Sequence, residues 1–410
     1  MKKIIFTFIA IVYSFVNYAQ TFTQGDLTFT VINRTEKKVS VKAKDTSIAG
    51  NIEIPEQVTN DDITYTVTSI ESSAFDRCDS VKSIILNDNI TNIGDWAFLN
   101  CHSLPSIHLP NSIATMGVGV FEACYKLHTV NIPNKISYIP AHMFADCISL
   151  ENFVIESHIT RIEEVAFWGC SNLSNITIPE SVNYIGASAF RNCISMETIN
   201  LPNELSYLGW SAFYNCSILS SITIPNKVEG ILSETFKDCK ALSFIILPNS
   251  LKNIQSEAFL GCTSLTSITI PNSVVTIGND AFYGCGNLYD FYFEPKKAPT
   301  LGRDVFKGLL EDIQIHIQSC ATGYTKENGY LGIIVKDLEC EGTNSISETF
   351  NFSDIYSYNG KIYVKSDVSE KIDIYSITGI KYTFTVNIGL NEFTLPKGIY
   401  VVNGKKIIIF

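Results

Sequence analysis

Hydrophobic and polar positions alternate along the middle of the chain in a pattern that recurs every 23 residues. In the unit at 97–117 the apolar positions are Phe98, Cys101, Leu104, Ile107, Leu109, Ile113 and Met116. The spacing of three among the first of these positions predicts a helical or 3₁₀ turn with one face inward. The polar–apolar alternation around Ile107 and Leu109 predicts a short, half-buried strand. Pro110 and Asn111 then predict a turn, after which the last two apolar positions return to the core.

The 23-residue register continues without insertion or deletion through ten units. Each unit has a cysteine three residues after a phenylalanine. The cysteines are Cys78, Cys101, Cys124, Cys147, Cys170, Cys193, Cys216, Cys239, Cys262 and Cys285, and the phenylalanines are Phe75, Phe98, Phe121, Phe144, Phe167, Phe190, Phe213, Phe236, Phe259 and Phe282. A short repeat of fixed length predicts a solenoid, in which each unit is one turn of a stack. Parallel pairing of the short strands, at about 4.8 Å per turn, would give a rod or shallow arc roughly 48 Å long.

The phenylalanine and cysteine columns are expected to fill the core of this solenoid. The structural ladder includes the pairs Phe98 and Cys101, Phe121 and Cys124, Phe190 and Cys193, and Phe259 and Cys262. Neighbouring cysteines in a column would have Cβ atoms about 4.8 Å apart, wider than the ~3.8 Å of a disulfide. We therefore expect reduced, buried thiols at all ten positions. Cys320 and Cys340 lie outside the register and could bridge each other, and the sequence leaves their disulfide state open.

The repeating motif Ala-Phe-x-x-Cys-x-x-Leu-x-x-Ile-x-Leu-Pro-x-x-Ile-x-x-Ile-Gly resembles the BspA-like leucine-rich repeat of bacterial surface proteins, and the match covers 67–293. The turn proline is present in seven of the ten units, and Asn87, Glu156 and Glu294 replace it in the others. The resemblance implies a leucine-rich-repeat solenoid of short parallel strands joined by turns or short helices. It also implies a surface protein that binds a partner.

The segments around the repeats predict an exported chain with capped ends. Residues 1–19 have two lysines followed by an apolar run, which is typical of a secretory signal peptide. No later run of eighteen apolar residues occurs, so we expect no transmembrane segment. Residues 20–66 and 294–340 are expected to cap the two ends of the core, because the first and last turns of a solenoid need cover. Residues 341–349 form a polar linker.

Residues 350–410 have a different character, with short strand-like runs separated by turn residues, and they predict a small all-β sandwich. The motif Ile-Tyr-Ser-Ile-Thr-Gly at 374–379 and the runs around Gly398, Tyr400 and Lys406 resemble the C-terminal sorting domain of type IX secretion. The resemblance implies that the type IX secretion machinery is a partner and that the protein is secreted or displayed by a Gram-negative bacterium. Whether the domain is then cleaved stays open. An ordinary accessory sandwich is the alternative interpretation.

Composition and charge narrow the classes of partner. The chain is 46% hydrophobic and carries a net charge of −11. An acidic chain without basic clusters argues against nucleic acid or an anionic membrane surface as partner. No catalytic, phosphate-binding or metal-binding motif occurs, and no two of the five histidines in the repeats share a column. We therefore predict no catalytic residues, no cofactor and no metal site, in a monomeric protein that is not an enzyme.

The outward strand positions form the predicted binding surface. Most are Ser, Thr or Asn, whereas Phe244 and Ile246 place two large apolar side chains on one strand. The candidate ligand-binding residues are Phe244, Ile246, His108, Asn131, Asn200 and Tyr292. Repeats of equal length leave no loop to enclose an active site, so two functions remain. One is an adhesin-like surface protein that binds an extracellular protein or glycan, and the other is a structural spacer in a surface assembly. The sequence identifies neither the ligand nor the face that binds it.

Overall fold

The computed structural model describes residues 20–338 and the segments 352–358, 361–366, 370–376, 381–386, 389–395, 398–402 and 405–409. The chain divides into two compact units, Met1–Cys340 and Glu341–Phe410, and each is described by itself. The predicted signal peptide, the predicted linker and Cys340 lie outside the described residues. Among the described residues, no helix is long and apolar enough to cross a membrane.

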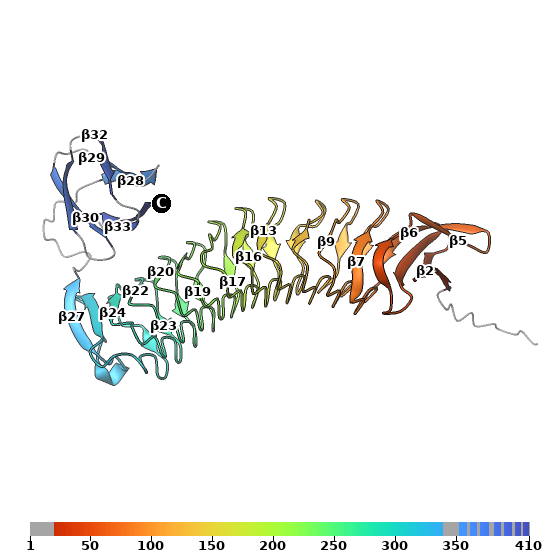
Figure 1. The fold of residues 1–410 in the computed structure, drawn as a ribbon. Coiled ribbons are helices and arrows are strands. Elements are labelled where there is room, and N and C mark those ends of the chain that lie inside the picture. The colour runs from red at the N-terminus through yellow and green to blue at the C-terminus, as the bar shows by residue number, and fades with distance from the viewer. Residues whose placement is uncertain are drawn as a thin grey trace, which may run out of the picture. The chain divides into compact units, whose positions relative to one another are not determined.

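The first unit is a solenoid whose turns stack along one axis, as Figure 1 shows between β7 and β24. One side of most turns carries a strand of the first strand ladder, and the turn at Thr198 has an isolated bridge to Ser221 instead. This ladder consists of β4 (Ala49–Glu53), β7 (Ser80–Ile85), β9 (Ser106–Ile107), β11 (Thr129–Val130), β13 (Asn152–Val154), β15 (Asn175–Thr177), β18 (Ser221–Thr223), β20 (Phe244–Ile246), β22 (Ser267–Ile270), β24 (Asp290–Phe293), β26 (Gln314–Gln318) and β27 (Ile333–Leu338). Paired strands are parallel, and Phe153 lies opposite Ile176, one repeat later. The predicted solenoid of short parallel strands is confirmed.

A second strand ladder follows the solenoid on another side of each turn. It consists of β8 (Asn92–Ile93), β10 (Thr115–Met116), β12 (Tyr138–Ile139), β14 (Arg161–Ile162), β16 (Tyr184–Ile185), β17 (Tyr207–Leu208), β19 (Gly230–Ile231), β21 (Asn253–Ile254), β23 (Thr276–Ile277) and β25 (Thr300–Leu301). The second residue of each strand from β8 to β23 is buried in the core. The sequence pattern predicts only that these positions return to the core, because a strand of two residues is too short to show alternation.

The segment between the phenylalanine and the strand forms turns rather than a helix. The Cys101 amide donates to the Phe98 carbonyl at 3.2 Å, as in the predicted 3₁₀ turn. Trp96 and Asn100 are left-handed, with φ of +52° and +58°, and they prevent the turn from continuing as a helix. The Phe98 amide instead donates to the Val120 carbonyl of the next repeat at 2.9 Å. Bonds of this kind add a third hydrogen-bonded ladder along the solenoid.

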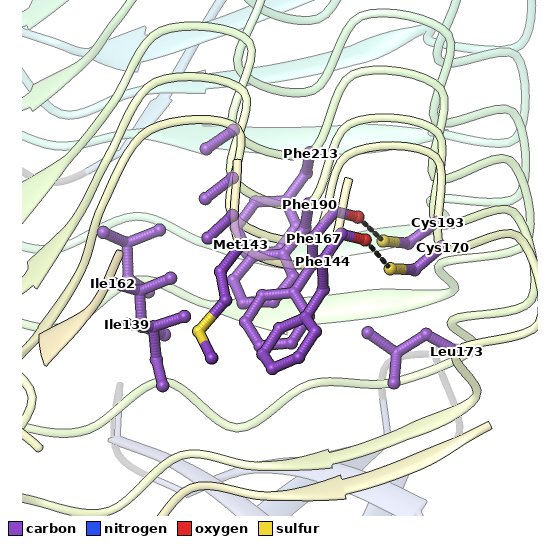
Figure 2. Close-up of a cluster of buried hydrophobic side chains, with 14 of the residues drawn as sticks. Ile139, Met143, Phe144, Ile162, Phe167, Cys170, Leu173, Phe190, Cys193 and Phe213 are labelled. Carbon is purple, nitrogen blue, oxygen red and sulfur yellow. Dashed lines mark hydrogen bonds between the residues drawn. The ribbon is translucent and has the colours of Figure 1, made fainter. Parts of the chain in front are cut away.

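The predicted phenylalanine column fills the core. Its ten side chains are fully buried. Neighbouring rings stack with centroids 5.3 to 6.1 Å apart and interplanar angles of 0 to 28°. Figure 2 shows four of these rings, from Phe144 to Phe213, in one stack. Each ring inside the column is therefore covered on both faces by the repeats before and after it.

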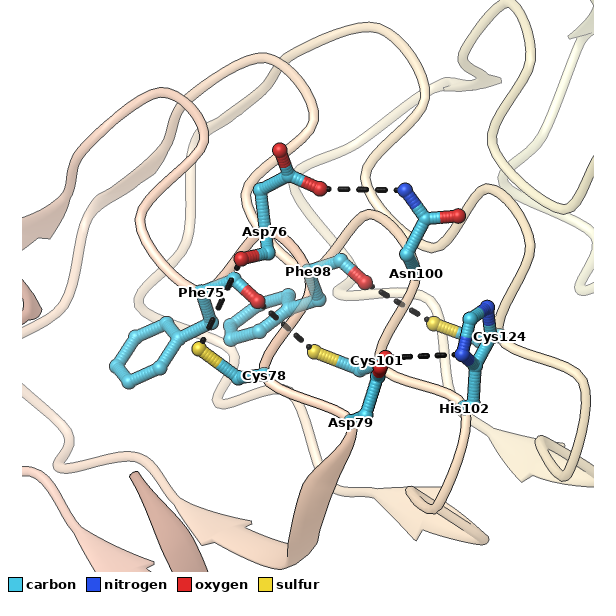
Figure 3. A network of polar contacts seen from close by, with 9 residues as sticks. All are labelled: Phe75, Asp76, Cys78, Asp79, Phe98, Asn100, Cys101, His102 and Cys124. Carbon is cyan, nitrogen blue, oxygen red and sulfur yellow. Dashed lines mark hydrogen bonds and ion pairs between the residues drawn. The ribbon is translucent and has the colours of Figure 1, made fainter. Parts of the chain in front are cut away.

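The cysteine column lies beside the phenylalanines, and all ten of its thiols are free and buried, which confirms the prediction. From Cys101 onward, each thiol donates to the carbonyl of the phenylalanine 26 residues earlier. The Cys101 bond to Phe75 is 3.2 Å long and the Cys124 bond to Phe98 is 3.1 Å long (Figure 3). Burial raises the pKa of Cys216 to about 12. These thiols are therefore protonated structural donors rather than reactive groups.

Cys320 lies outside this column and forms a disulfide. The partner predicted for it, Cys340, lies outside the described residues. Near Cys320, two aromatic side chains close the C-terminal end of the core. Tyr324 and Tyr330 pack edge-on against Phe293, at 5.4 and 5.6 Å between ring centroids. Their hydroxyls donate to backbone carbonyls at 2.7 and 2.8 Å, so the buried polar atoms are satisfied. The one helix of the described solenoid, η1 (Lys326–Asn328), lies between these tyrosines.

At the other end, β1 (Thr21–Gln24), β2 (Leu27–Asn33) and β3 (Lys38–Ala43) form an antiparallel sheet. Strand β3 pairs in parallel with β6 (Ile63–Ile70), which is also the antiparallel partner of β5 (Gln57–Asn60). Because β6 pairs onward with β8, this sheet continues directly into the second strand ladder. The first turns of the solenoid core are covered in this way.

The second unit contains seven strands in two antiparallel sheets. One sheet has the order β28 (Phe352–Tyr358), β29 (Lys361–Ser366), β32 (Gly389–Thr394), and the other has the order β31 (Lys381–Val386), β30 (Glu370–Ser376), β33 (Gly398–Val402), β34 (Lys405–Ile409). Phe384 of one sheet contacts Phe393 of the other, with ring centroids 4.5 Å apart. This contact between the sheets is what the predicted small sandwich requires. Gly398 and Tyr400 lie in β33 and Lys406 lies in β34, which pair with each other.

Candidate binding face

Five of the six predicted ligand-binding residues share one outward position of the first strand ladder. We call this set of positions the outer column. It consists of His108, Asn131, Val154, Thr177, Asn200, Thr223, Ile246, Thr269, Tyr292 and His316. The sixth residue, Phe244, lies on the same strand as Ile246 and opposite Ser221. The candidates therefore share a face but are spread along it, and they do not form one compact site.

The candidates differ in how far they are exposed. His108 and Asn200 are exposed, whereas Phe244 and Ile246 are half-buried in β20. Tyr292 is also half-buried, because its ring stacks on His316 of the next strand at 4.5 Å between centroids. A partner would thus reach only part of each apolar side chain. The strands with Ser, Thr and Asn leave more of the face open.

Asn131 has a structural role within the ladder. The Leu109 amide donates to Asn131 Oδ1 at 2.8 Å, and Asn131 Nδ2 donates to the Leu109 carbonyl at 2.8 Å. The side-chain amide thereby takes the place of backbone pairing between two turns. These two bonds hold the Asn131 amide in place, so it is a poor candidate for direct contact with a ligand.

The first strand ladder is interrupted at several places, and one of them lies next to this asparagine. Strand β9 pairs with β11, and β13 pairs with β15, but in the described solenoid no pairing joins β11 to β13. The amides of Ile155 and Ile224 each donate to the next strand at 3.0 Å, whereas the equivalent amides of Ile132, Ile178 and Leu247 have no such bond within residues 20–338. Two departures from the repeat occur at this interruption, and the same two, Phe291 and Glu294, occur at β24, which is paired on both sides. Phe153 replaces the usual Ile or Val of the inner strand position, and Glu156 replaces the turn proline.

A hollow of about 510 Å³ opens at this interruption, between the outer ends of β11 and β13. Its polar lining consists of four asparagines with His128, Thr129 and Glu156. Val130, Phe153 and Val154 are among its apolar lining residues. The described residues that line it include no lysine or arginine. Of the predicted candidates, the hollow includes only Asn131.

The second strand ladder carries an aromatic column that the sequence reasoning missed. Tyr138, Arg161, Tyr184 and Tyr207 are consecutive outward positions of β12, β14, β16 and β17. The Arg161 guanidinium lies 3.8 Å from the centroid of the Tyr184 ring, which stacks on Tyr207 at 4.8 Å. Arg161 Nε also donates to Glu163 at 2.7 Å, so the cation is paired. The signal was present in the sequence, as large side chains at one position of four successive repeats.

The described part of the chain has no group of three or more His, Cys, Asp or Glu side chains that could hold a metal ion. His102 is paired with Asp79 at 2.8 Å (Figure 3). Its ring also stacks on Tyr125, with 4.4 Å between the ring centroids. What the solenoid offers is surface, in the form of the outer column, the hollow and the aromatic column.

Comparison with known proteins found several similar solved structures. Three solved structures similar to this chain are a leucine-rich repeat protein from Bacteroides ovatus, a leucine rich cell surface protein from Faecalibacterium prausnitzii and the pneumococcal vaccine antigen PcpA. They are 23%, 22% and 18% identical to it, with TM-scores of 0.49, 0.47 and 0.49. The alignments cover 77%, 80% and 78% of this chain and 100%, 97% and 99% of those chains. No curated protein sequence matches the chain significantly.

The BspA type leucine rich repeat region matches this chain at residues 46–174, 162–289 and 229–325. Together these segments extend over more than half of the chain. They also coincide with the two strand ladders and the phenylalanine and cysteine columns. The chain therefore belongs to the BspA-type leucine-rich repeat family.

Proposed function

We propose that this protein is an adhesin-like binding protein, secreted or displayed at the cell surface, that engages an extracellular protein or glycan through the outer column. The observation that carries this proposal is the hollow beside β11 and β13, where a rigid solenoid face becomes concave and is lined by side-chain amides. Concave surfaces lined by a few polar groups over an apolar floor are typical of binding sites. Membership of the BspA-type repeat family supports the same function.

The test is a binding survey of the purified full chain against immobilised extracellular-matrix proteins and an array of glycans. We expect saturable binding to at least one ligand, and loss of that binding after heat denaturation. Absence of saturable binding in both panels would contradict the proposal. The alternative, a structural spacer, would then be favoured, because the continuous phenylalanine and thiol columns provide rigidity whether or not a ligand exists.

We also propose that the second unit is a type IX sorting domain, with Gly398, Tyr400 and Lys406 in its signal. The resemblance of these strands to sorting domains supports this, and the pairing of β33 with β34 places the three residues on adjacent strands. Removal of residues 405–410 should leave the protein in the periplasm, as measured by cell fractionation and surface proteolysis. Unchanged surface display would mean that the second unit is an accessory sandwich.

A further inference from the structure

We infer that the hollow between β11 and β13 binds a neutral saccharide. The inference rests on the proposed function, because it names the class of ligand for part of the same face. Three observations support it: the charge of the lining residues, the side-chain donors and acceptors that make no internal hydrogen bond, and the apolar residues at the base of the hollow.

The charge of the lining argues against an anionic ligand. Among the described residues that line the hollow, only His128 and Glu156 have ionisable side chains. The lysine that follows Asn134, Lys135, directs its ammonium group to the Ser112 carbonyl at 3.4 Å. A sulfated glycan or a phosphate would therefore meet a carboxylate without a cation to compensate it, and such ligands are normally bound by Arg or Lys. A neutral polyol has no such requirement.

Two side-chain amides at the hollow are held by a hydrogen bond to their oxygen, which leaves their NH₂ groups available as donors to a ligand. Asn152 Oδ1 accepts a bond from Asn175 Nδ2 at 2.9 Å. Asn111 Oδ1 accepts a bond from the Asn134 backbone amide at 3.1 Å. In each case the oxygen is occupied, and the Nδ2 group of the same amide has no partner among the described residues. These groups can donate to hydroxyl oxygens without first breaking an internal bond.

Acceptors are present beside these donors. His128 Nδ1 lies 2.9 Å from the Lys126 carbonyl, which can only accept, so Nδ1 carries the proton and Nε2 of the neutral ring is an acceptor. Glu156 is exposed and its carboxylate has no ion-pair partner in the described residues. Hydroxyl groups both donate and accept, so a sugar with several adjacent hydroxyls satisfies donors and acceptors together. A fatty acid or a single cation would satisfy only part of this lining.

An apolar floor completes the match. The Val154 side chain is 63% exposed, which places it among the most exposed large apolar residues of the described chain. Val130 beside it is half-buried, and Phe153 lies beneath with its ring packed between Phe144 and Phe167. A pyranose ring presents hydroxyls at its rim and C–H groups on its face, so it can cover this floor while its rim meets the amides. The volume of about 510 Å³ lies within the range of small-molecule sites, roughly 300–1,000 Å³.

The experiment compares two matched double variants of the full chain by isothermal titration calorimetry. The hollow variant is Asn111→Ala with Val154→Thr, which removes one of the two amides with an available donor and reduces the apolar floor. The control variant is Asn226→Ala with Thr223→Val, at the same two repeat positions of later turns, outside the hollow. The probes are neutral trisaccharides of hexose and of N-acetylhexosamine units, with a heparin tetrasaccharide as the anionic comparison. All four substitutions are at exposed positions, so both variants should keep the unfolding temperature of the wild type within a few degrees.

We expect the wild type and the control variant to bind at least one neutral trisaccharide with equal affinity. The hollow variant should bind the same trisaccharide at least tenfold more weakly. The heparin tetrasaccharide should not compete for the site. Equal binding by the hollow variant and the wild type, or a preference for heparin, would overturn the inference. If no saccharide binds but an extracellular-matrix protein still does, the inference fails and the proposed function stands. If neither binds, both fail.

Discussion

The inner and outer columns of the solenoid follow the same 23-residue register but differ in how uniform they are. The phenylalanine and cysteine positions are occupied by the same two residue types in all ten repeats, and every one of these side chains is buried. The outer column holds residues as different as His108, Asn131, Val154, Thr223 and Tyr292. Stability is thus supplied by a set of identical contacts, whereas any preference for a ligand must come from positions that the core does not constrain.

The difference follows from what each position touches. A ring in the phenylalanine column meets the rings before and after it, so a change of size would disturb three repeats. Most outer side chains from His108 to Thr269 meet solvent and their two neighbours on adjacent strands, whereas His316 at the end of the column is buried. One inner position departs from its column at the hollow, where Phe153 is larger than the neighbouring Val130. Strands β11 and β13 are not paired with each other at the same place, but in the described solenoid β20 and β22 are also not paired, without such a residue, so the size of the inner side chain alone does not account for the gap.

The largest expected effect is truncation of one inner ring. Phe190→Ala removes a fully buried side chain that stacks on Phe167 and Phe213 at 5.4 and 5.5 Å, and should lower the free energy of unfolding by about 3–5 kcal/mol. Thr223→Ala, in the exposed outer column, should change it by no more than about 0.5 kcal/mol. Guanidinium denaturation followed by circular dichroism measures both. Similar costs for the two variants would break the distinction between inner and outer columns.

The second prediction uses the thiols and has a direction in pH. Burial raises the pKa of Cys216 to about 12, above the ordinary thiol value of about 8.5 that it regains on unfolding. Its contribution to stability is fully present below about pH 8.5 and is lost as the pH rises toward the folded value, because only the unfolded thiol ionises there. Between pH 9 and 11 the unfolding free energy of the wild type should therefore decrease as the pH rises. In Cys216→Ala this decrease should be shallower, by up to about 1.4 kcal/mol per pH unit.

The control for this measurement is Thr223→Ala, which should leave the pH dependence unchanged. Titration with a thiol reagent adds an independent check. The ten column cysteines should react in denaturant without reductant, and few should react in the native protein. An unaltered pH dependence in the Cys216 variant, or disulfides between neighbouring column cysteines by mass spectrometry, would contradict the role assigned to these thiols.

The sequence predicts the inner columns well because each is a strict repeat of one residue type. The fixed spacing of Phe98 and Cys101 gives the register, the buried thiols and the first strand ladder. It does not give the thiol bond from Cys101 to the Phe75 carbonyl, which depends on how far one turn is offset from the next. It also does not give the left-handed turn residues, since even the β-branched Val165 has φ of +60°. Backbone bonds between repeats impose that conformation, and local residue preference opposes it.

The outer face is harder to predict for a related reason. The hollow lies where β11 and β13 are not paired, and no residue type encodes an absent hydrogen bond. Glu156 in place of the turn proline and Phe153 in a column of mostly Ile and Val are visible in the sequence, but Phe291 and Glu294 are the same departures at the paired strand β24. The exposure of Phe244 and Ile246 was likewise not readable, because their half-buried state depends on the strands beside β20.

The smallest expected effect concerns this half-buried pair. Replacing Phe244 with Ser and Ile246 with Thr matches the residue types of neighbouring strands and removes partly exposed apolar surface, so the stability cost should be about 1 kcal/mol or less. The reverse pair, Ser221→Phe with Thr223→Ile on β18, is the matched control.

If the pair on β20 anchors a protein partner, its loss should weaken the affinity for that partner by about 2 kcal/mol, or roughly thirtyfold, as measured by surface plasmon resonance. Unchanged affinity would place the protein contact elsewhere on the outer column. A stability loss as large as that of Phe190→Ala would instead show that these two side chains belong with the inner columns.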